Sequence, residues 1–563
     1  MEELLSLEEA SKMLGVKPAT LRKWDNEGRL NAIRIGSRRD RRYKKSQIDK
    51  IISHSTEAVY DIQELDGAMH SFFGYIESFI GGLKENYGRG MSRHLLVSEN
   101  GHVKVAYSYE ELMELGEFIS KRLLEDPIFA EKIVAECNYC FEQSDLLIKE
   151  CRQEKRSLLE FLEKTEAIYK KGLSWSMLIE PLDAFLLKAI KNKITLDAQE
   201  ATSIFGILST PLAESFVMRQ QKAIAQLAQL ISKDAALLCI FKDLSAEDIE
   251  NKIKGSEIEK KINEVCREFY WWKADYIRYI PLTALDVIAY VQEKLSKGTD
   301  LSKEIYKLDH YLEELKKAKA SAIERICPDE ELTHWLWIIN AIGPLHDARK
   351  EWFLKMQAVF EMILDEISAL RNISQDILRY CSPTELRSLV MGEEIDLESI
   401  SRREKYCVMI SDIEGHTIIY GGEAKKIEEE ELGFGKNELV NLVKGTAVSF
   451  GTVSGRARVV YSSEEARQKI KPGDILVTSM TRPDFVPFME IAAAIVTNEG
   501  GITCHAAILS RELQIPCVVG TRIATRVIND GDIIEVNGTH GIIYILERAV
   551  KKNPPQRVCT IIF

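Results

Sequence analysis

The sequence predicts a multidomain, mainly α-helical protein with an N-terminal winged helix-turn-helix, a large all-α middle region and a C-terminal α/β domain. Three observations lead to this prediction. Only four glycines occur between Lys104 and Lys297, where long amphipathic runs fit helices. Ten glycines occur from Gly445 to Gly541, among short β-branched runs typical of strands. The first 50 residues combine two short helical patterns with an arginine-rich turn.

The 563 residues are enough for three or four domains at roughly 100–200 residues each. The net charge of −12 is unevenly distributed. Residues 1–50 carry +5, with 13 Lys/Arg against 8 Asp/Glu, so the remainder carries −17. A basic head on an acidic body confines any nucleic-acid contact to the head.

Nothing in the sequence points to a membrane or to secretion. The acidic start, Met1 to Leu5, lacks the basic and apolar regions of a secretory signal. No apolar run approaches the ~18 residues that span a bilayer. The 11 cysteines are scattered and odd in number, which indicates reduced thiols rather than a disulfide framework. We therefore expect a cytoplasmic protein without a membrane partner. No metal site is predicted, because the single CxxC, Cys137–Cys140, lacks a second ligand pair.

The head, residues 1–54, begins with apolar residues at helical spacing over Leu7–Leu14, and Gly15 ends this pattern. A second helix is expected over Lys17–Trp24, with a proline in its first turn. The segment Arg34–Tyr43 then places a glycine turn and five arginines between two short strands. Such a wing contacts phosphates while the second helix enters the major groove.

These residues resemble the DNA-binding domain of the MerR and excisionase families, through Ser6–Ala10, Thr20–Trp24, Glu27–Leu30 and Arg41–Tyr43. The alternatives are a solvated basic surface or a protein-docking module. Regulators of these families dimerise through a long helix after the wing, but no clean heptad run follows here, so dimerisation stays open. The resemblance implies DNA contacts from Lys17, Thr20, Arg22, Lys23, Arg38, Arg39, Arg41, Arg42 and Tyr43.

Residues 55–380 are expected to form a helical body that binds an acceptor or a partner, followed by a linker region over 381–440. Predicted helices include Glu111–Leu124, Pro211–Ser232 and Asp347–Ile373. A group of aromatic residues either lines an acceptor pocket or, in the favoured interpretation, packs in the helical core: Phe269, Tyr270, Trp271, Trp272, Tyr276 and Tyr279.

The string Thr497–Leu513 is the most informative in the chain. A strand is expected to end at Thr497, two glycines allow a tight turn, and Thr503 is the expected N-cap of a helix. His505 then lies in the first turn, where free N–H groups and the helix dipole favour an anion. The same dipole disfavours a protonated imidazole and leaves a nucleophilic ring nitrogen. The alternative is a packing or capping histidine.

The segment from Gly445 to about Leu546 resembles the phosphohistidine swivelling domain of phosphoenolpyruvate (PEP)-utilising enzymes, which include PEP synthase, pyruvate phosphate dikinase and rifampicin phosphotransferase. The resemblance rests on Gly445–Ala457, Pro472–Thr478, Thr481–Asp484, Gly500–Ala507 and Ile515–Gly520. It implies an α/β swivelling domain over 441–548, with a short tail over 549–563, in which His505 takes the phosphoryl group. Thr503 and Arg511 would assist His505, and Gly500, Gly501 and Cys504 would contact the phosphate.

No glycine-rich cradle of Walker type is found, and nothing resembles the ATP-grasp domain or the PEP-binding barrel of the full-length enzymes. We therefore expect no cofactor bound by this chain itself, and Mg²⁺ with ATP or PEP brought by a separate nucleotide- or PEP-binding subunit. Phenylphosphate synthase, with its histidine subunit and nucleotide subunit on separate chains, is a precedent.

The sequence leaves three functions open. The chain is a phosphohistidine-carrying phosphotransferase component with a small-molecule acceptor, a DNA-binding regulator that uses the swivelling domain as a sensor, or a chain whose swivelling domain has lost catalysis and only binds. The preferred hypothesis combines the first two: a phosphohistidine transfer protein with a DNA-binding head.

Overall fold

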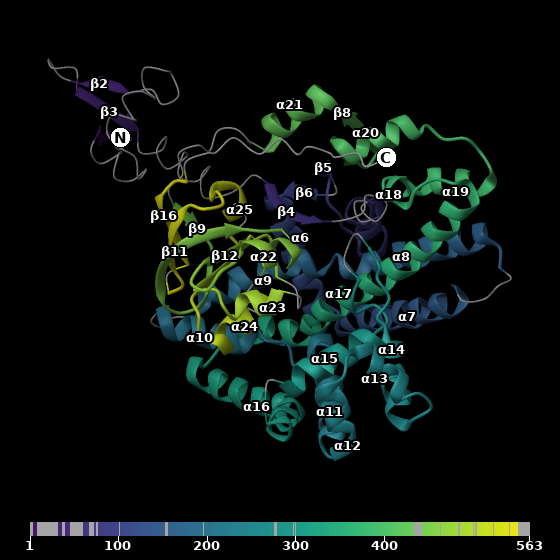
Figure 1. Ribbon diagram of the computed structural model, residues 1–563. Helices are drawn as coiled ribbons and strands as arrows, with labels where there is room; N and C mark the ends of the chain where they lie inside the picture. The colour runs from purple at the N-terminus through teal and green to yellow at the C-terminus, as the bar shows by residue number, and fades with distance from the viewer. Residues whose placement is uncertain are drawn as a thin grey trace. The chain divides into compact units, whose positions relative to one another are not determined.

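The computed structural model describes residues 4–7, 32–35, 40–44, 60–66, 73–74, 77–100, 102–151, 156–194, 196, 198–274, 278–296, 298, 300–432, 442–461, 463–481, 485–498, 500, 504–521, 523–539 and 541–549 (Figure 1). The chain divides into two compact units. One comprises residues 1–61 with 108–110, and the other comprises residues 62–107 with 111–563.

The N-terminal unit holds an antiparallel sheet ordered β1-β3-β2, formed by β1 (Leu4–Ser6), β2 (Ile33–Ile35) and β3 (Asp40–Lys44). Strands β2 and β3 agree with the two predicted strands of the wing, whereas β1 was not predicted. The two predicted helices of the head, apart from Leu7, and the turn of the wing at residues 36–39 lie outside the described residues.

The second unit contains a helical body organised around α17 (Glu330–Arg371), which packs against helices α7 to α11. This helix of 42 residues begins where the Asp329 carboxylate accepts a hydrogen bond from the Leu332 backbone N–H at 2.8 Å, and it ends at Asn372 in the left-handed conformation. The predicted segment Asp347–Ile373 is therefore the second half of a longer helix that continues through Pro344.

The remaining helices of the body before residue 383 include the other two predicted segments, here Tyr109–Glu125 and Phe216–Ser232. They are η1 (Ser78–Gly82), α5 (Leu83–Tyr87), α6 (Tyr109–Glu125), α7 (Pro127–Cys151), α8 (Leu158–Ser176), α9 (Ile179–Lys193), α10 (Ala198–Ser209), α11 (Phe216–Ser232), α12 (Ala235–Asp243), α13 (Ala246–Lys252), α14 (Glu257–Glu268), α15 (Ala284–Ser296), α16 (Leu301–Ile326) and α18 (Gln375–Leu378).

The closest approach between α8 and α17 depends on a glycine. Trp352 of α17 is fully buried, and a Cβ at Gly172 of α8 would lie only 2.1 Å from its ring. The indole also stacks on Tyr169, with ring centroids 5.6 Å apart, and meets the edge of Trp175 at 6.0 Å. A side chain at position 172 would therefore force the two helices apart, because a close-packed interior has no room to absorb it.

The prediction of an all-α middle region is wrong in one respect: the unit also contains a five-stranded sheet, ordered β4-β6-β5-β7-β8. Its strands are β4 (Tyr60–Asp66), β5 (Arg93–Glu99), β6 (His102–Ser108), β7 (Cys407–Asp412) and β8 (Gly415–Tyr420). Strands β5 and β7, from opposite ends of the helical body, pair antiparallel with Leu96 opposite Met409. This long-range pairing has no local signature in the sequence.

The region predicted as a linker, 381–440, is folded between residues 383 and 432. It contributes α19 (Pro383–Met391), α20 (Leu397–Lys405) and α21 (Gly421–Leu432), in addition to β7 and β8. Two ion pairs hold this region in place. Lys104 on β6 pairs with Glu428 on α21, with Nζ 2.7 Å from Oε1. Within the region, Arg403 donates to both carboxylate oxygens of Glu385 at 2.6 and 2.7 Å. The glutamates and lysines of this region, which favoured a linker, instead form helices and ion pairs.

The C-terminal domain is an eight-stranded mixed sheet with short helices, and its order is β10-β14-β13-β12-β11-β15-β16-β9. Strands β11 to β14 run parallel to their neighbours in that series, and the outer pairings are antiparallel. The elements are β9 (Leu442–Lys444), β10 (Thr446–Ser449), β11 (Thr452–Val459), α22 (Ser463–Lys469), β12 (Ile475–Thr478), α23 (Val486–Met489), β13 (Ala494–Thr497), α24 (His505–Leu513), β14 (Cys517–Val519), α25 (Ala524–Val527), β15 (Ile533–Asn537) and β16 (Ile542–Glu547).

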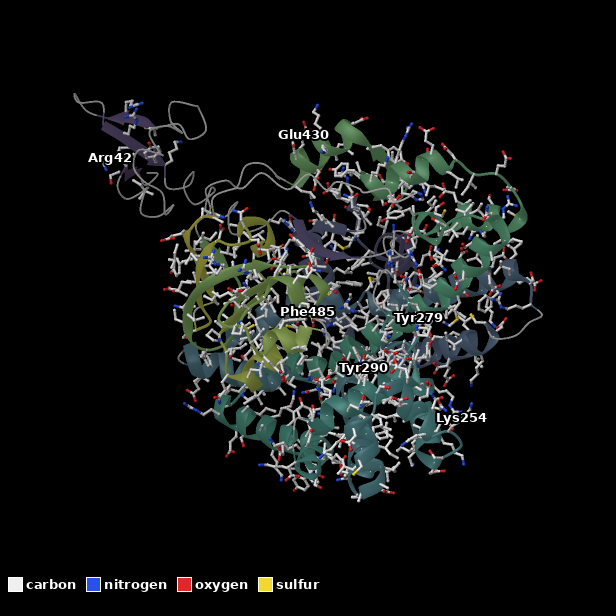
Figure 2. The ribbon with its side chains drawn as sticks, in the orientation of Figure 1. Arg42, Lys254, Tyr279, Tyr290, Glu430 and Phe485 are labelled. Atoms are coloured by element: carbon white, nitrogen blue, oxygen red, sulfur yellow. The ribbon has the colours of Figure 1, made fainter. Side chains whose placement is uncertain are left out.

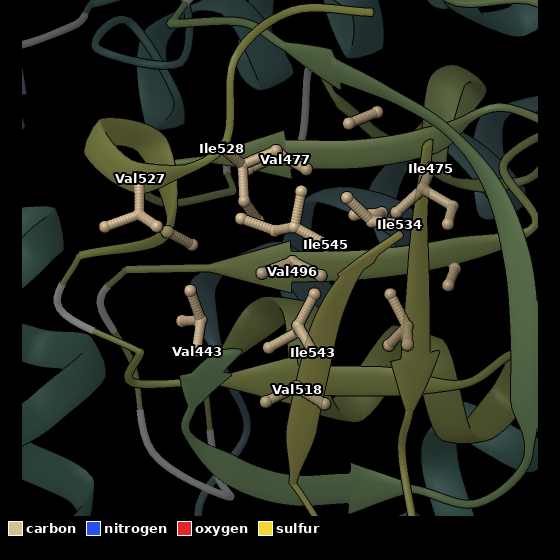
Figure 3. Packing of buried hydrophobic residues seen from close by; sticks show 14 of the residues in the cluster. Val443, Ile475, Val477, Val496, Val518, Val527, Ile528, Ile534, Ile543 and Ile545 are labelled. Atoms are coloured by element: carbon tan, nitrogen blue, oxygen red, sulfur yellow. The ribbon is translucent and has the colours of Figure 1, made fainter. Parts of the chain in front are cut away.

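Aliphatic side chains from neighbouring strands form the core of this domain. Figure 3 shows Val477, Val496 and Val518 in a row across three strands, and the register places them directly opposite one another. The short β-branched runs that predict strands in this region are confirmed, as are the strand that ends at Thr497 and the helix with His505 in its first turn. The predicted α/β character of the domain is therefore confirmed.

Within the described residues, no single helix has the length and apolar character needed to cross a membrane. The pair Phe216–Ser232 and Ala235–Asp243 meets both criteria only when its two helices are taken together, and they meet at a bend of 115°.

His94 on β5 is a buried imidazole inside the five-stranded sheet. It lies between Phe79 and Tyr107, with ring centroids 5.0 and 5.4 Å away. Neither ring nitrogen has a hydrogen-bond partner within the part of the chain that the structure describes. Burial lowers the pKa of His94 from 6.5 to about 3, because a charged ring would lose its hydration without compensation.

This depressed pKa predicts a loss of stability in mild acid. Below pH 6.5 the unfolded chain binds a proton at His94 that the folded chain does not, so the free energy of unfolding falls by ~1.4 kcal/mol per pH unit. We expect His94→Phe, which keeps an aromatic ring at this position, to lose less stability than the wild type between pH 6.5 and 5. Urea unfolding at both pH values measures this, and equal pH dependence of the two proteins would contradict it.

Candidate functional site

The N-terminus of α24 is the centre of the candidate site, and His505 is the first residue of this helix. The residue before it, Cys504, is the N-cap, with extended backbone angles of φ −70° and ψ 163° and no capping hydrogen bond from its side chain. The predicted N-cap, Thr503, is therefore wrong by one position. The helix begins directly at His505, so the backbone N–H groups of its first turn have no intrahelical partners.

The loop that leads to His505 is fixed at its start by a buried amide. Asn498 follows β13 and is 2% exposed. Its Oδ1 accepts hydrogen bonds from the Thr525 backbone N–H at 3.0 Å and from Thr521 Oγ1 at 3.4 Å, and its Nδ2 donates to Thr525 Oγ1. Sequence analysis missed these three residues, although a polar residue between a buried strand and a glycine pair is a signal for a fixed loop.

Two glycines let this loop pass close to its neighbours. Gly500 has φ +105°, and a Cβ there would lie 2.7 Å from Cys504 Sγ. Gly520 follows β14 with φ +64°, and its Cβ would lie 2.8 Å from the Gly500 carbonyl oxygen. The loops after β13 and β14 therefore pack with main chain against main chain, which only glycine permits at these positions. Gly501 and Thr503 lie outside the described residues.

The cysteines beside the histidine are held as neutral thiols. Burial raises the pKa of the Cys504 thiol above its usual value, and burial also raises the pKa of Cys517 on β14. A neutral thiol is a poor nucleophile, so neither cysteine is activated for attack.

Arg511 lies in the last turn of α24, where a cation stabilises the negative end of the helix dipole. Six residues separate it from His505, which corresponds to about 9 Å along the axis and about 240° of rotation. The predicted role of Arg511 beside His505 stays a prediction.

In the N-terminal unit, β3 carries the described part of the predicted DNA contacts. Tyr43 is fully buried, so its prediction as a DNA contact is wrong and it belongs to the packing of the unit. Because strand residues alternate between faces, Arg41 shares the face of Tyr43, whereas Arg42 shares the opposite face with Lys44. Figure 2 shows Arg42 on this strand. Lys17, Thr20, Arg22, Lys23, Arg38 and Arg39 lie outside the described residues.

Among the described residues, no group of three or more His, Cys, Asp or Glu side chains is arranged to hold a metal ion.

Comparison with known proteins assigns both ends of the chain. Residues 470–541 match the family model "PEP-utilising enzyme, mobile domain", and residues 4–54 match the model "Helix-turn-helix domain". The probable phosphoenolpyruvate synthase of Archaeoglobus fulgidus is 50% identical over 136 residues, which are 24% of this chain and 18% of that protein. The phosphoenolpyruvate synthase of Aeropyrum pernix is 51% identical over 122 residues, 22% of this chain and 14% of that protein.

The similarity extends further for one relative. The uncharacterised phosphotransferase YvkC of Bacillus subtilis is 28% identical over 342 residues, which are 57% of this chain and 41% of that protein. The chain thus spans less than a fifth of the length of the two synthases named above and less than half of YvkC.

Two solved structures were also matched, the holo form of Thermococcus kodakaraensis aconitase X and an NMR structure of the Enzyme I protein nEIt. The first is 18% identical, covers 19% of this chain and 98% of its own, and has a TM-score of 0.16. The second is 13% identical, covers 64% and 79%, and has a TM-score of 0.15. TM-scores this low do not indicate a shared fold.

The family models, by contrast, identify a mobile domain of the PEP-utilising enzyme family at residues 470–541 and a helix-turn-helix domain at residues 4–54.

Proposed function

We propose that this chain is a phosphohistidine-carrying protein of phosphotransferase type, in which the phosphoryl group passes through His505. The observation that carries the proposal is the strand–loop–helix in which His505 opens α24 behind a loop fixed by Asn498 and Gly500. The phosphoenolpyruvate synthases and the phosphotransferase YvkC support the same chemistry.

In the charging step, a neutral ring nitrogen of His505 attacks the phosphorus of the donor. An N–P bond forms, and the P–O bond to the leaving group breaks. In the second step, an oxygen of the acceptor attacks the phosphorus, the N–P bond breaks, and its electron pair returns to the ring nitrogen. The N–H groups of the first turn and the positive end of the helix dipole stabilise the phosphoryl group while it is bound. We expect Gly500 and Cys504 to contact the phosphoryl group, as the resemblance implies.

The donor is ATP or PEP held by a separate partner polypeptide, and Mg²⁺ that accompanies the donor neutralises phosphate charge there. The acceptor is a small molecule bound by the helical body. The similarity to YvkC extends over 342 residues, which is more than the C-terminal domain contains, so it includes part of the helical body.

The first prediction concerns His505 itself. Incubation of the purified chain with cell extract and labelled ATP or PEP is expected to place acid-labile label on the wild type and none on His505→Ala. His310→Ala is the matched control, because His310 is a half-buried histidine on α16, remote in sequence from the C-terminal domain. Equal labelling of wild type and His505→Ala would remove His505 from the mechanism.

The second prediction concerns Gly500. A methyl group there collides with Cys504 and disturbs the helix start, so Gly500→Ala is expected to slow labelling of His505 by roughly tenfold to a hundredfold, as misplaced reacting groups do. Gly473→Ala is the matched control. It also has a positive φ, of +87°, but a Cβ there meets no atom within 4 Å. If both variants slow labelling equally, backbone strain alone is responsible and the close approach has no role.

The alternative function is transcriptional regulation, with the C-terminal domain as a sensor or binding module. The two strands of the wing and the match to a helix-turn-helix model favour a DNA-binding head. The alternatives are distinguished by turnover: a phosphotransferase component passes label from His505 to a small acceptor, whereas a sensor retains it and changes its affinity for DNA.

The third prediction tests the head. Arg42→Ala is expected to weaken DNA binding and to reduce the slope of log K against log salt concentration by about 1, the effect of one lost phosphate contact. Arg42 suits this test because it lies on the face opposite the buried Tyr43. Lys121→Ala on α6 removes the same charge from an exposed side chain of the second unit and serves as control. Identical salt slopes for the two variants would place Arg42 away from DNA.

A further inference from the structure

The helical body carries an open groove of about 490 Å³ that belongs to neither site described above. One wall is α14 and the residue that follows it closely, Tyr270. The other wall is the segment that leads into α15. The lining residues are Lys260, Asn263, Cys266, Arg267, Tyr270, Tyr279, Pro281 and Leu282. The volume lies within the range of about 300–1,000 Å³ that small-molecule sites occupy.

The polar wall follows from the periodicity of α14. Ile258, Ile262 and Val265 are buried on one side of the helix and anchor it in the body. Lys260, Asn263, Arg267 and Tyr270 follow one another at intervals of three or four residues, so they form one stripe along the groove. The groove is therefore built on a helix whose opposite face is fixed by packing.

No carboxylate lines the groove beside the two cations on this stripe. Arg267 donates from Nε to the Asn263 carbonyl oxygen at 3.2 Å. Lys260 pairs with Glu257 at 3.5 Å, but both side chains are about 70% exposed, and such pairs contribute little. Burial raises the pKa of Cys266 in the groove, and the charges of Asp286 and Glu250 add to this effect, although neither carboxylate lines the groove. Two positive charges on a wall whose lining holds no carboxylate favour an anion.

The opposite wall of the groove is mainly apolar. Pro281 and Leu282 present aliphatic surface, and Tyr279 adds an aromatic ring. Figure 2 shows Tyr279 within the helical body, and it also shows Lys254, which follows α13 and does not line the groove. A ligand that matches both walls combines a flat apolar portion with an anionic group.

We propose that this groove binds a small aryl anion, with Arg267 and Lys260 holding the phosphate or carboxylate and Tyr279, Pro281 and Leu282 contacting the ring. Arg267 provides the more specific contact, because its two terminal nitrogens form parallel hydrogen bonds to two anionic oxygens. This binding requires no phosphoryl group on His505, so it stands independently of the function proposed above.

The experiment measures binding of phenyl phosphate to the full chain by calorimetry, with benzoate, inorganic phosphate and phenol in parallel. Phenyl phosphate is expected to bind more tightly than inorganic phosphate, which lacks the ring, and more tightly than phenol, which lacks the charge. Arg267→Gln is expected to weaken phenyl phosphate binding by about tenfold, the cost of one charge-assisted contact. Lys254→Gln, the matched loss of an exposed lysine nearby, is expected to leave it unchanged.

Three results would overturn the proposal: no binding of either aryl anion at millimolar concentration, equal affinity for phenyl phosphate and inorganic phosphate, or unchanged affinity in Arg267→Gln. The thermal unfolding midpoint of each variant shows whether the fold is retained. Arg267→Lys keeps the positive charge but loses the pair of parallel hydrogen bonds, so its affinity for phenyl phosphate is expected to lie between those of the wild type and Arg267→Gln. His505→Ala is expected to bind phenyl phosphate as the wild type does. Ligand binding in the groove and phosphoryl transfer through His505 are thereby measured separately.

Discussion

The contact between Trp352 and Gly172 determines how the helical body is assembled. The indole occupies the space that a side chain on α8 would take, and at the same time it stacks on Tyr169 and contacts Trp175 edge to face. Because α17 also packs against α7, α9, α10 and α11, its distance from α8 sets the positions of most other helices. Large buried aromatic rings contribute more to such a core than any other side chains, and they tolerate little displacement. The walls of the groove beside α14 depend on the same packed helices.

The C-terminal domain uses a different device to place its histidine. Its parallel strands end in loops, and the loops after β13 and β14 touch through the main chain at Gly500 and Gly520. The amide of Asn498 joins the first loop to the start of α25 through Thr525. The start of α24 at His505 is thus positioned by backbone geometry and buried hydrogen bonds.

Local patterns predicted the C-terminal domain well, because each of its strands is a short β-branched run bounded by turn residues, and its helix follows a glycine pair. The N-cap was misplaced by one residue because Thr503 caps helices far better than Cys504, yet the helix begins at His505. The β5–β6 hairpin carried a signal that was overlooked, since Asn100-Gly101 between two apolar strands is a strong hairpin sequence. The pairing of β5 with β7 joins residues that are distant in the chain, and no local pattern encodes it.

The five-stranded sheet has an evolutionary consequence. Strands β5 and β7 are neighbours, although some 300 residues of helical body separate them in the chain. The chain therefore enters and leaves the body at one place, as it does in domains that tolerate insertion into other proteins. A module of this kind can acquire or exchange the domains fused before and after it without repacking its own core. Recombination between genes can then join one helical body to different flanking domains, and a helix-turn-helix domain on one side with a mobile domain on the other is one such combination.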